Sequence, residues 1–183
     1  MASLKKLVKD YRDYYQHDVE KRLTSYKQLN EQYSQLVDCS VRGILPSGTR
    51  APRQRKYAKY ALKTVTANLI DAEQKIKDSS SFDEVLLVVY NCKVKGFPAP
   101  SVYNTALRLG SCFNLWPDIV HLHSNALTGA KTLLGSNINW QYFNDDKNYP
   151  YLAKTDFPVE LQVLEPYHIE NFLNVYNDRL RSI

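Results

Sequence analysis

Apolar side chains in the first forty residues recur every three or four positions, the spacing of one face of an α-helix. The pattern predicts an N-terminal helical segment over residues 1–42, with Ser3 as its N-cap. The pattern leaves open whether this is one long helix or two helices that break near His17. The positions that follow the spacing are Leu4, Leu7, Val8, Tyr11, Tyr15, Val19, Leu23, Tyr26, Leu29, Tyr33, Leu36 and Val37.

Residues 43–53 contain two glycines and two prolines, a composition that predicts a loop. Helical spacing then resumes and predicts a helix from about Gln54 to Lys77. Its inward positions are expected to be Tyr57, Tyr60, Ala61, Val65, Leu69, Ala72 and Ile76.

A capping-box pattern, Ser81 followed by Glu84 three residues later, predicts the start of the next helix. The apolar run 85–90 follows it, and the cap favours helix over buried strand there. After a turn that contains glycine and proline, another helix is expected over about residues 101–113.

The C-terminal third is expected to combine helices with irregular chain. A short extended piece is predicted over residues 119–123, and then a helix that starts at Ser124 or Asn125 and ends before Gly135. Residues 136–160 are expected to be irregular. Pro166 opens a last amphipathic helix, since proline is favourable at the first helical position.

Together these elements predict a mostly all-α fold. The N-terminal helical segment, residues 1–42, precedes a compact multi-helix domain over residues 43–183, whose core is expected at residues 80–135. The 183 residues, 44% of them apolar, are enough to bury a substantial core. Only six glycines occur, which argues against a turn-rich β architecture.

The cysteines and the hydropathy pattern bear on where the protein works. Cys39, Cys92 and Cys112 are far apart and form no CxxC pair, so we expect buried reduced thiols rather than disulfides or a zinc ribbon. The N-terminus lacks the apolar run of a signal peptide, and no stretch approaches the length of a membrane helix. We therefore expect a cytoplasmic or nucleoid-associated protein without a membrane partner.

Charge is distributed unevenly along the chain. The net charge is only +5, but no acidic residue occurs between Asp38 and Asp71. A field of one sign suits a polyanion such as nucleic acid or an anionic membrane. The alternative interpretation is a solvated basic helix face. The cations of this stretch are Arg42, Arg50, Arg53, Arg55, Lys56, Lys59 and Lys63.

The most informative stretch is residues 85–113, in which an apolar helix, a tight turn and a second helix follow one another. With Gly96-Phe97-Pro98 at the turn and small side chains after Ser101, the stretch resembles a helix-hairpin-helix motif. The resemblance implies a helix-hairpin-helix-like core over residues 80–135. Such a hairpin points backbone N–H groups and a helix N-terminus at one DNA phosphate.

The likeness extends to the glycosylases of the endonuclease III type, in which a Val-Asp-x-His segment and a further helix follow the hairpin. Residues 117–123 and the sequence LTGAKTLLG take those places here. The chain departs from the family at the positions of the family's catalytic residues. The family's catalytic lysine falls near Pro100 and its aspartate at His121, so the resemblance implies a DNA-binding relative that lacks the catalytic pair.

Other constellations support weaker hypotheses. His121 and His123 alternate along an extended piece and face one way, so with His168 or Cys112 they could bind a metal. Structural histidines are the favoured interpretation, and no metal or other cofactor is expected. Asp145-Asp146 could form a single-metal carboxylate site, but a solvated turn is favoured. The aromatic residues Trp140, Tyr142, Phe143, Tyr149 and Tyr151 could stack on bases, but a plug against the core is favoured.

These observations give one functional hypothesis: a non-catalytic DNA-binding protein that binds phosphates largely independently of sequence, with strong salt dependence. The basic helix is expected to contribute Arg50, Arg53, Arg55, Lys56, Lys59 and Lys63. The hairpin turn is expected to contribute Lys93, Lys95, Gly96 and Phe97, with Ser101 at the following helix start. Arg108 and Lys131 are expected to extend this surface.

Two alternatives remain open. The chain could be a helical adaptor that docks an acidic protein partner on the same basic face. It could also be a divergent glycosylase-like enzyme, although the sequence holds no complete catalytic constellation. That enzyme would require a carboxylate with a raised pKa beside a deep pocket, for which Asp118 and Glu84 are the candidates.

Overall fold

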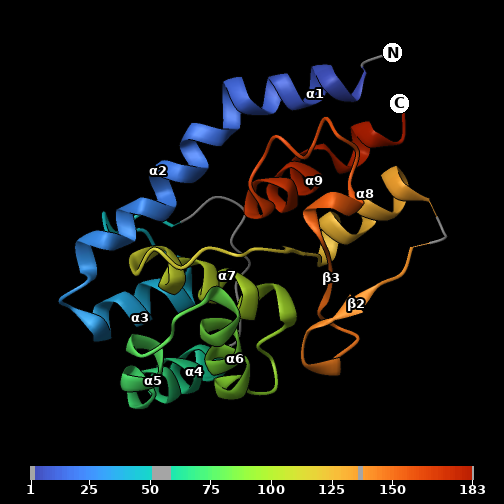
Figure 1. Ribbon diagram of the computed structural model, residues 1–183. Coiled ribbons are helices and arrows are strands. Elements are labelled where there is room, and N and C mark those ends of the chain that lie inside the picture. Colours follow the sequence, from blue (N-terminus) through green and yellow to red (C-terminus); the bar gives the residue numbers. More distant parts are fainter. Residues whose placement is uncertain (1–2, 51–58, 136–137, 183) are drawn as a thin grey trace. The chain divides into compact units, whose positions relative to one another are not determined.

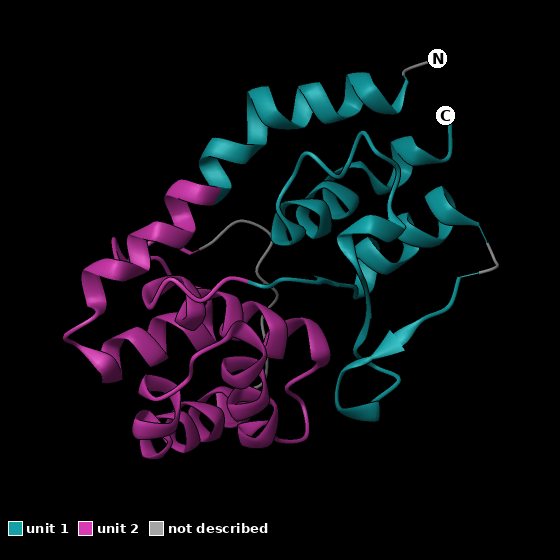
Figure 2. Ribbon diagram, viewed as in Figure 1, with its two compact units in different colours: residues 1–19, 117–183 teal, residues 20–116 magenta. Residues whose placement is uncertain are grey.

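The computed structural model describes residues 3–50, 59–135 and 138–182, and it is mostly helical, as the sequence predicts (Figure 1). No helix in these ranges has the length and apolar character needed to cross a membrane. The chain forms two compact units, one of residues 1–19 and 117–183 and the other of residues 20–116 (Figure 2). The predicted N-terminal segment 1–42 is thus divided between them.

Helical winding continues from Leu4 to Leu29, through α1 (Leu4–Tyr11), a π-helical turn (Arg12–Gln16), α2 (His17–Ser25) and a 3₁₀ turn (Tyr26–Leu29). The Ser3 hydroxyl accepts the N–H of Lys6, which confirms the predicted N-cap. The winding changes just before His17, the position at which the sequence pattern allows a break, but the helix does not stop there. The chain leaves the helix only after Leu29, and α3 (Tyr33–Arg42) follows.

The unit of residues 20–116 packs α3 against α4 (Lys59–Asp71), with α5 (Glu73–Lys77), α6 (Phe82–Cys92) and α7 (Ala99–Cys112) completing it. Ser81 caps α6 by accepting the Glu84 N–H, as predicted. The Glu84 carboxylate accepts the backbone N–H of Ser80 at 2.6 Å, and a backbone hydrogen bond from Ser81 also helps to lower its pKa. Buried hydroxyls tie the helices together; the Tyr33 hydroxyl, for example, donates to the Leu69 carbonyl at 3.0 Å.

The other unit combines α1 with α8 (Ser124–Leu134), α9 (Pro166–Leu180) and a small antiparallel sheet. Strand β3 (Pro150–Leu152) lies between β1 (Val120–His121) and β2 (Gln141–Tyr142). Short 3₁₀ turns at Phe143–Asp145 and Lys154–Asp156 connect the remaining chain. The register pairs Val120 with Leu152 and Gln141 with Tyr151, so β-strands form within the stretch that was expected to be irregular.

Close contact between α8 and α9 depends on Gly129. A Cβ at this position would come within 2.9 Å of the Leu173 carbonyl oxygen, closer than real contacts allow. The core around this contact is apolar and includes Phe172, Leu173 and Tyr176, with Trp140 packed against it. Tyr149 is buried and its ring contacts Phe143, which favours the core-plug interpretation of the aromatic stretch.

Candidate nucleic-acid interface

Helix α4 presents one apolar and one basic side. Ala61, Val65 and Leu69 are buried at intervals of four residues, which fixes the rotation of the helix on the core. Lys59 and Lys63 lie on the opposite side and are exposed. This rotation also turns Tyr60 outward with 75% of its surface exposed, so the prediction that Tyr60 faces inward is wrong.

The bend between α6 and α7 lies along α4. At its start, the Asn68 side-chain amide donates to the carbonyl of Cys92, the last residue of α6, at 3.1 Å. Further on, a Cβ built on Gly96 would lie 3.6 Å from the Cβ of Ala61. Asn68 and Ala61 are seven residues apart, about 10 Å along a helix. The bend therefore runs toward the same end of α4 that carries Lys59 and Lys63.

Conformation explains the glycine of the bend. Gly96 has φ of +91°, a region that side chains with a Cβ rarely adopt. Phe97 is buried and anchors the bend in the core, whereas Lys95 and Gly96 are exposed. Lys93 is half-buried, with its Nζ 3.4 Å from the centre of the Tyr90 ring. The bend therefore carries two cations: Lys95, which is exposed, and Lys93, whose ammonium group lies over the Tyr90 ring.

The backbone of the bend offers little to a phosphate at two of the expected positions. The Phe97 N–H donates to the Val94 carbonyl at 3.0 Å, and the Ser101 N–H donates to the Pro98 carbonyl at 2.8 Å. Pro98 and Pro100 have no N–H. The Phe97 and Ser101 side chains are both buried. These contacts give no support to the prediction that Phe97 and Ser101 bind a phosphate.

Arg108 is also misassigned by the sequence pattern. Only 8% of the residue is exposed, and its guanidinium donates from Nη1 to the Ser40 carbonyl at 2.8 Å. It therefore connects α7 to α3 inside the unit and does not extend a surface. Helical phase places Arg108 among the buried residues of α7. The sequence pattern shows its charge but not the buried Ser40 carbonyl that accepts from it.

The other predicted cations fall in different places. Arg53, Arg55 and Lys56 lie outside the described residues. Arg50 is exposed at the end of a tight loop, in which its backbone pairs with that of Ile44. Lys131 is exposed on α8, which belongs to the other unit.

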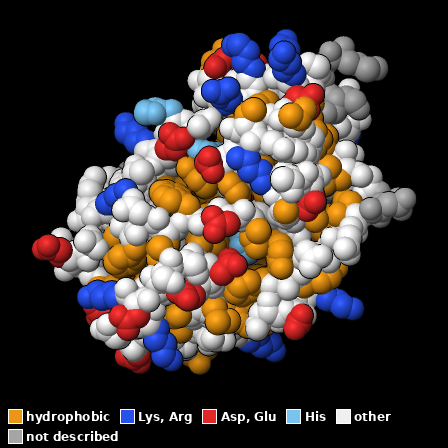
Figure 3. Space-filling view, in the orientation of Figure 1, with side chains coloured by type: hydrophobic (Ala, Val, Ile, Leu, Met, Phe, Trp, Pro, Cys, Tyr) orange, Lys and Arg blue, Asp and Glu red, His pale blue; other side chains and the backbone are white. Residues whose placement is uncertain are grey.

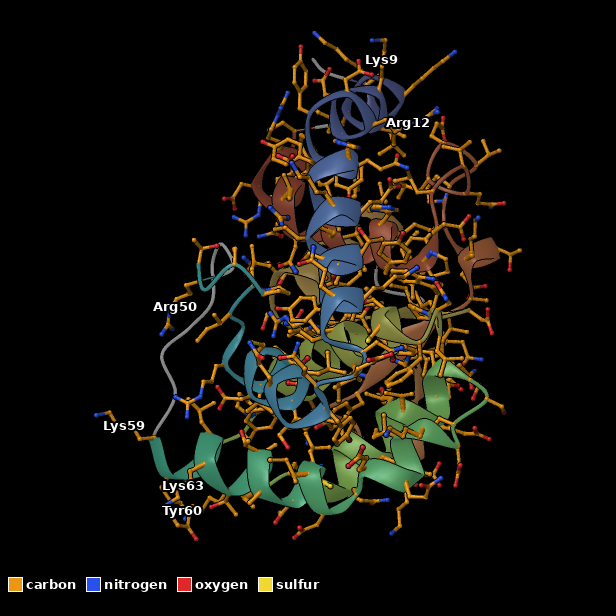
Figure 4. The ribbon with its side chains drawn as sticks, turned by 90° about the vertical axis from the view of Figure 1, so that its left-hand side faces the viewer. Lys9, Arg12, Arg50, Lys59, Tyr60 and Lys63 are labelled. Atoms are coloured by element: carbon orange, nitrogen blue, oxygen red, sulfur yellow. The ribbon has the colours of Figure 1, made fainter. Side chains whose placement is uncertain are left out.

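In the view of Figure 4, the side chains of Arg50, Lys59 and Lys63 point away from the body along one edge. We call the set Arg50, Lys59, Lys63, Lys93 and Lys95 the α4 basic face. By contrast, Lys and Arg are interspersed with Asp and Glu on the face drawn in Figure 3.

Ion pairs leave most of the α4 basic face uncompensated within the described ranges. Within the described ranges, no carboxylate lies within ion-pairing distance of Arg50, Lys59, Lys63 or Lys95, whereas Arg42 pairs with Asp38 at 2.6 Å. Lys59 and Lys63 are four residues apart on one helix, a spacing at which like charges repel by a few tenths of a kcal/mol. The arrangement thus slightly disfavours the helix while keeping both charges available to an anion.

A second polar cluster, in the unit that contains α9, is buried. The His123 Nε2 lies 3.6 Å from the Glu170 Oε1, and the Asn174 side-chain amide donates to the same Oε1 at 2.8 Å. Burial raises the pKa of Glu170 to about 8; burial, together with neighbouring His121, lowers the pKa of His123 to about 3. Near neutral pH both groups are therefore uncharged.

Glu170 was missed as a candidate carboxylate, although helical spacing places it three residues before the inward Leu173. The two predicted carboxylates do not provide the required group. Asp118 is exposed, and the pKa of exposed Glu84 is lowered because its carboxylate accepts the Ser80 N–H. His168 is buried and bonds to the Tyr11 hydroxyl at 2.9 Å, as expected of a structural histidine.

Within the described ranges, no three histidine, cysteine or acidic residues form a group that could hold a metal ion. In comparisons with known proteins, no family, no curated protein and no solved structure matches this chain. The functional argument therefore depends on the α4 basic face alone.

Proposed function

We propose that this protein binds DNA through the α4 basic face, largely independently of sequence. The observation that carries the proposal is the exposure of Lys59 and Lys63 on the side of α4 that faces away from the core, with no carboxylate of the described residues within ion-pairing distance. The contact of Gly96 with Ala61 places the bend at the same end of α4, on its buried side. Phosphates are the ligands that clustered lysine and arginine side chains attract most strongly.

The proposal assigns the binding energy to charge rather than to base edges. The cations belong to a helix side and a bend, and nothing in their pattern matches the paired donors that read bases in a groove. Arg53, Arg55 and Lys56 lie between Arg50 and Lys59 in the chain, so the sequence adds charge to the same stretch. The proposal assigns no catalytic step to the chain.

The test is a titration of labelled duplex and single-stranded DNA at several salt concentrations. With four to five phosphate contacts, the logarithm of the affinity should fall by roughly 3–4.5 per tenfold rise in salt. Scrambling the sequence should leave the affinity unchanged. Failure to bind at low salt, or an affinity that salt does not change, overturns the proposal. A co-purifying acidic protein that survives nuclease treatment would indicate the adaptor instead.

A further inference from the structure

The rotation of α4 exposes the large side chain of Tyr60 to solvent beside Lys59 and Lys63. Three quarters of its surface is exposed, and its side chain points outward with theirs in Figure 4. Its backbone is held in the helix, since the Thr64 hydroxyl donates to the Tyr60 carbonyl at 3.0 Å. The backbone of Tyr60 is therefore held in the helix, while its ring is open to solvent.

An exposed aromatic ring beside two cations that pair with no carboxylate of the described residues matches the chemistry of an unpaired nucleotide. Such a nucleotide offers a phosphate to each cation and an open base surface to the ring, and stacking on an aromatic side chain tolerates any base. In a duplex, the base surfaces are covered by their neighbours, so a ring on a convex helix cannot stack on them. A duplex would thus contact the two lysines but not the Tyr60 ring.

We propose that the α4 basic face binds single-stranded polynucleotides in preference to duplexes, with Tyr60 stacking on one base while Lys59 and Lys63 bind the flanking phosphates. This proposal rests on the proposed function and adds the state of the strand that is recognised.

The experiment compares four proteins: the wild type, Tyr60→Ala, Tyr60→Phe and Tyr14→Ala. Tyr14 provides a matched control because it is 74% exposed, close to the 75% of Tyr60, but lies in the π-helical turn beside Asp13. The ligands are a 20-nucleotide oligothymidine, an oligouridine, an abasic strand of equal length and a 20-base-pair duplex, all at one low salt concentration.

We expect the wild type to bind oligothymidine more tightly than either the duplex or the abasic strand. Tyr60→Ala should lose about tenfold in affinity for oligothymidine, the value of one stacked base, and almost nothing for the abasic strand. Tyr60→Phe retains the ring and should bind like the wild type, as should Tyr14→Ala. An equal loss on oligouridine would extend the same stacking to RNA.

The inference is overturned if oligothymidine and the abasic strand bind equally, or if Tyr60→Ala binds oligothymidine like the wild type. Steep salt dependence in that case would leave the proposed function standing. Absence of binding to every strand would overturn both.

Discussion

Gly96 packs against Ala61, and this contact brings the α6–α7 bend onto the N-terminal half of the described part of α4. The contact is of ordinary van der Waals length, so a methyl group would fit there. The φ of +91° is the obstacle, because a residue with a Cβ is strained in that conformation.

Gly96→Ala should therefore lower the free energy of unfolding by about 1–2 kcal/mol and reduce DNA affinity by shifting the bend. Gly135→Ala is the control, since Gly135 has φ of +81° with nothing near its missing Cβ. We expect a similar stability loss in urea denaturation from the control, with unchanged DNA affinity. If the two variants bind DNA with equal affinity, the conformation of the bend does not contribute to binding.

Arg108→Met should destabilise the protein without weakening DNA binding by the folded molecules. Methionine fills a similar space but cannot donate to the Ser40 carbonyl, and an unpaired buried acceptor costs about 1–3 kcal/mol. Arg42→Met removes only a surface ion pair and should cost less than about 1 kcal/mol. A loss of DNA affinity in folded Arg108→Met would contradict this account, because it would mean that Arg108 takes part in DNA binding.

Local signals in the sequence predicted several helix starts, because a cap acts within a few residues. Ser3, Ser81 and Pro166 all mark helix starts as expected. The strands were harder to predict because β3 pairs with β1, thirty residues earlier in the chain. A two-residue strand carries no periodicity, and its pairing depends on the fold around it.

The candidate site could be predicted only in part, for a related physical reason. Counting charges identified the region of Lys59 and Lys63, since the count needs no structure. It could not separate exposed cations from Arg108, which bonds to a carbonyl 68 residues away. Tyr60 was assigned inward because it is aromatic, whereas Ala61 sets the phase of the helix.

Glu170 should give the protein a dependence of stability on pH that glutamine at this position removes. Its pKa is about 8 in the fold and 4.5 when unfolded, so the fold favours the protonated form. Its contribution is complete below pH 4.5 and disappears as pH rises through 8. His123 acts in the opposite direction, but only between about pH 3 and 6.5.

Between pH 6.5 and 8.5, wild-type stability should therefore fall while Glu170→Gln stays nearly flat. At pH 8.5 the variant should be more stable by up to a few kcal/mol. Glu165→Gln, an exposed position at the start of the same helix, should follow the wild-type curve. Urea denaturation at each pH measures this, and parallel curves for all three proteins would contradict the assignment.

The most direct measurement is the DNA affinity of Lys59→Glu/Lys63→Glu beside that of Lys21→Glu/Lys75→Glu. Both pairs are exposed lysines of the same unit and change the net charge equally, but only the first lies on the α4 basic face. We predict a loss of about tenfold per lysine for the first pair, with a salt slope smaller by about 1.4–1.8. The second pair should lose less than about threefold. Equal losses would mean that DNA responds only to total charge, and the α4 basic face would not be the binding site.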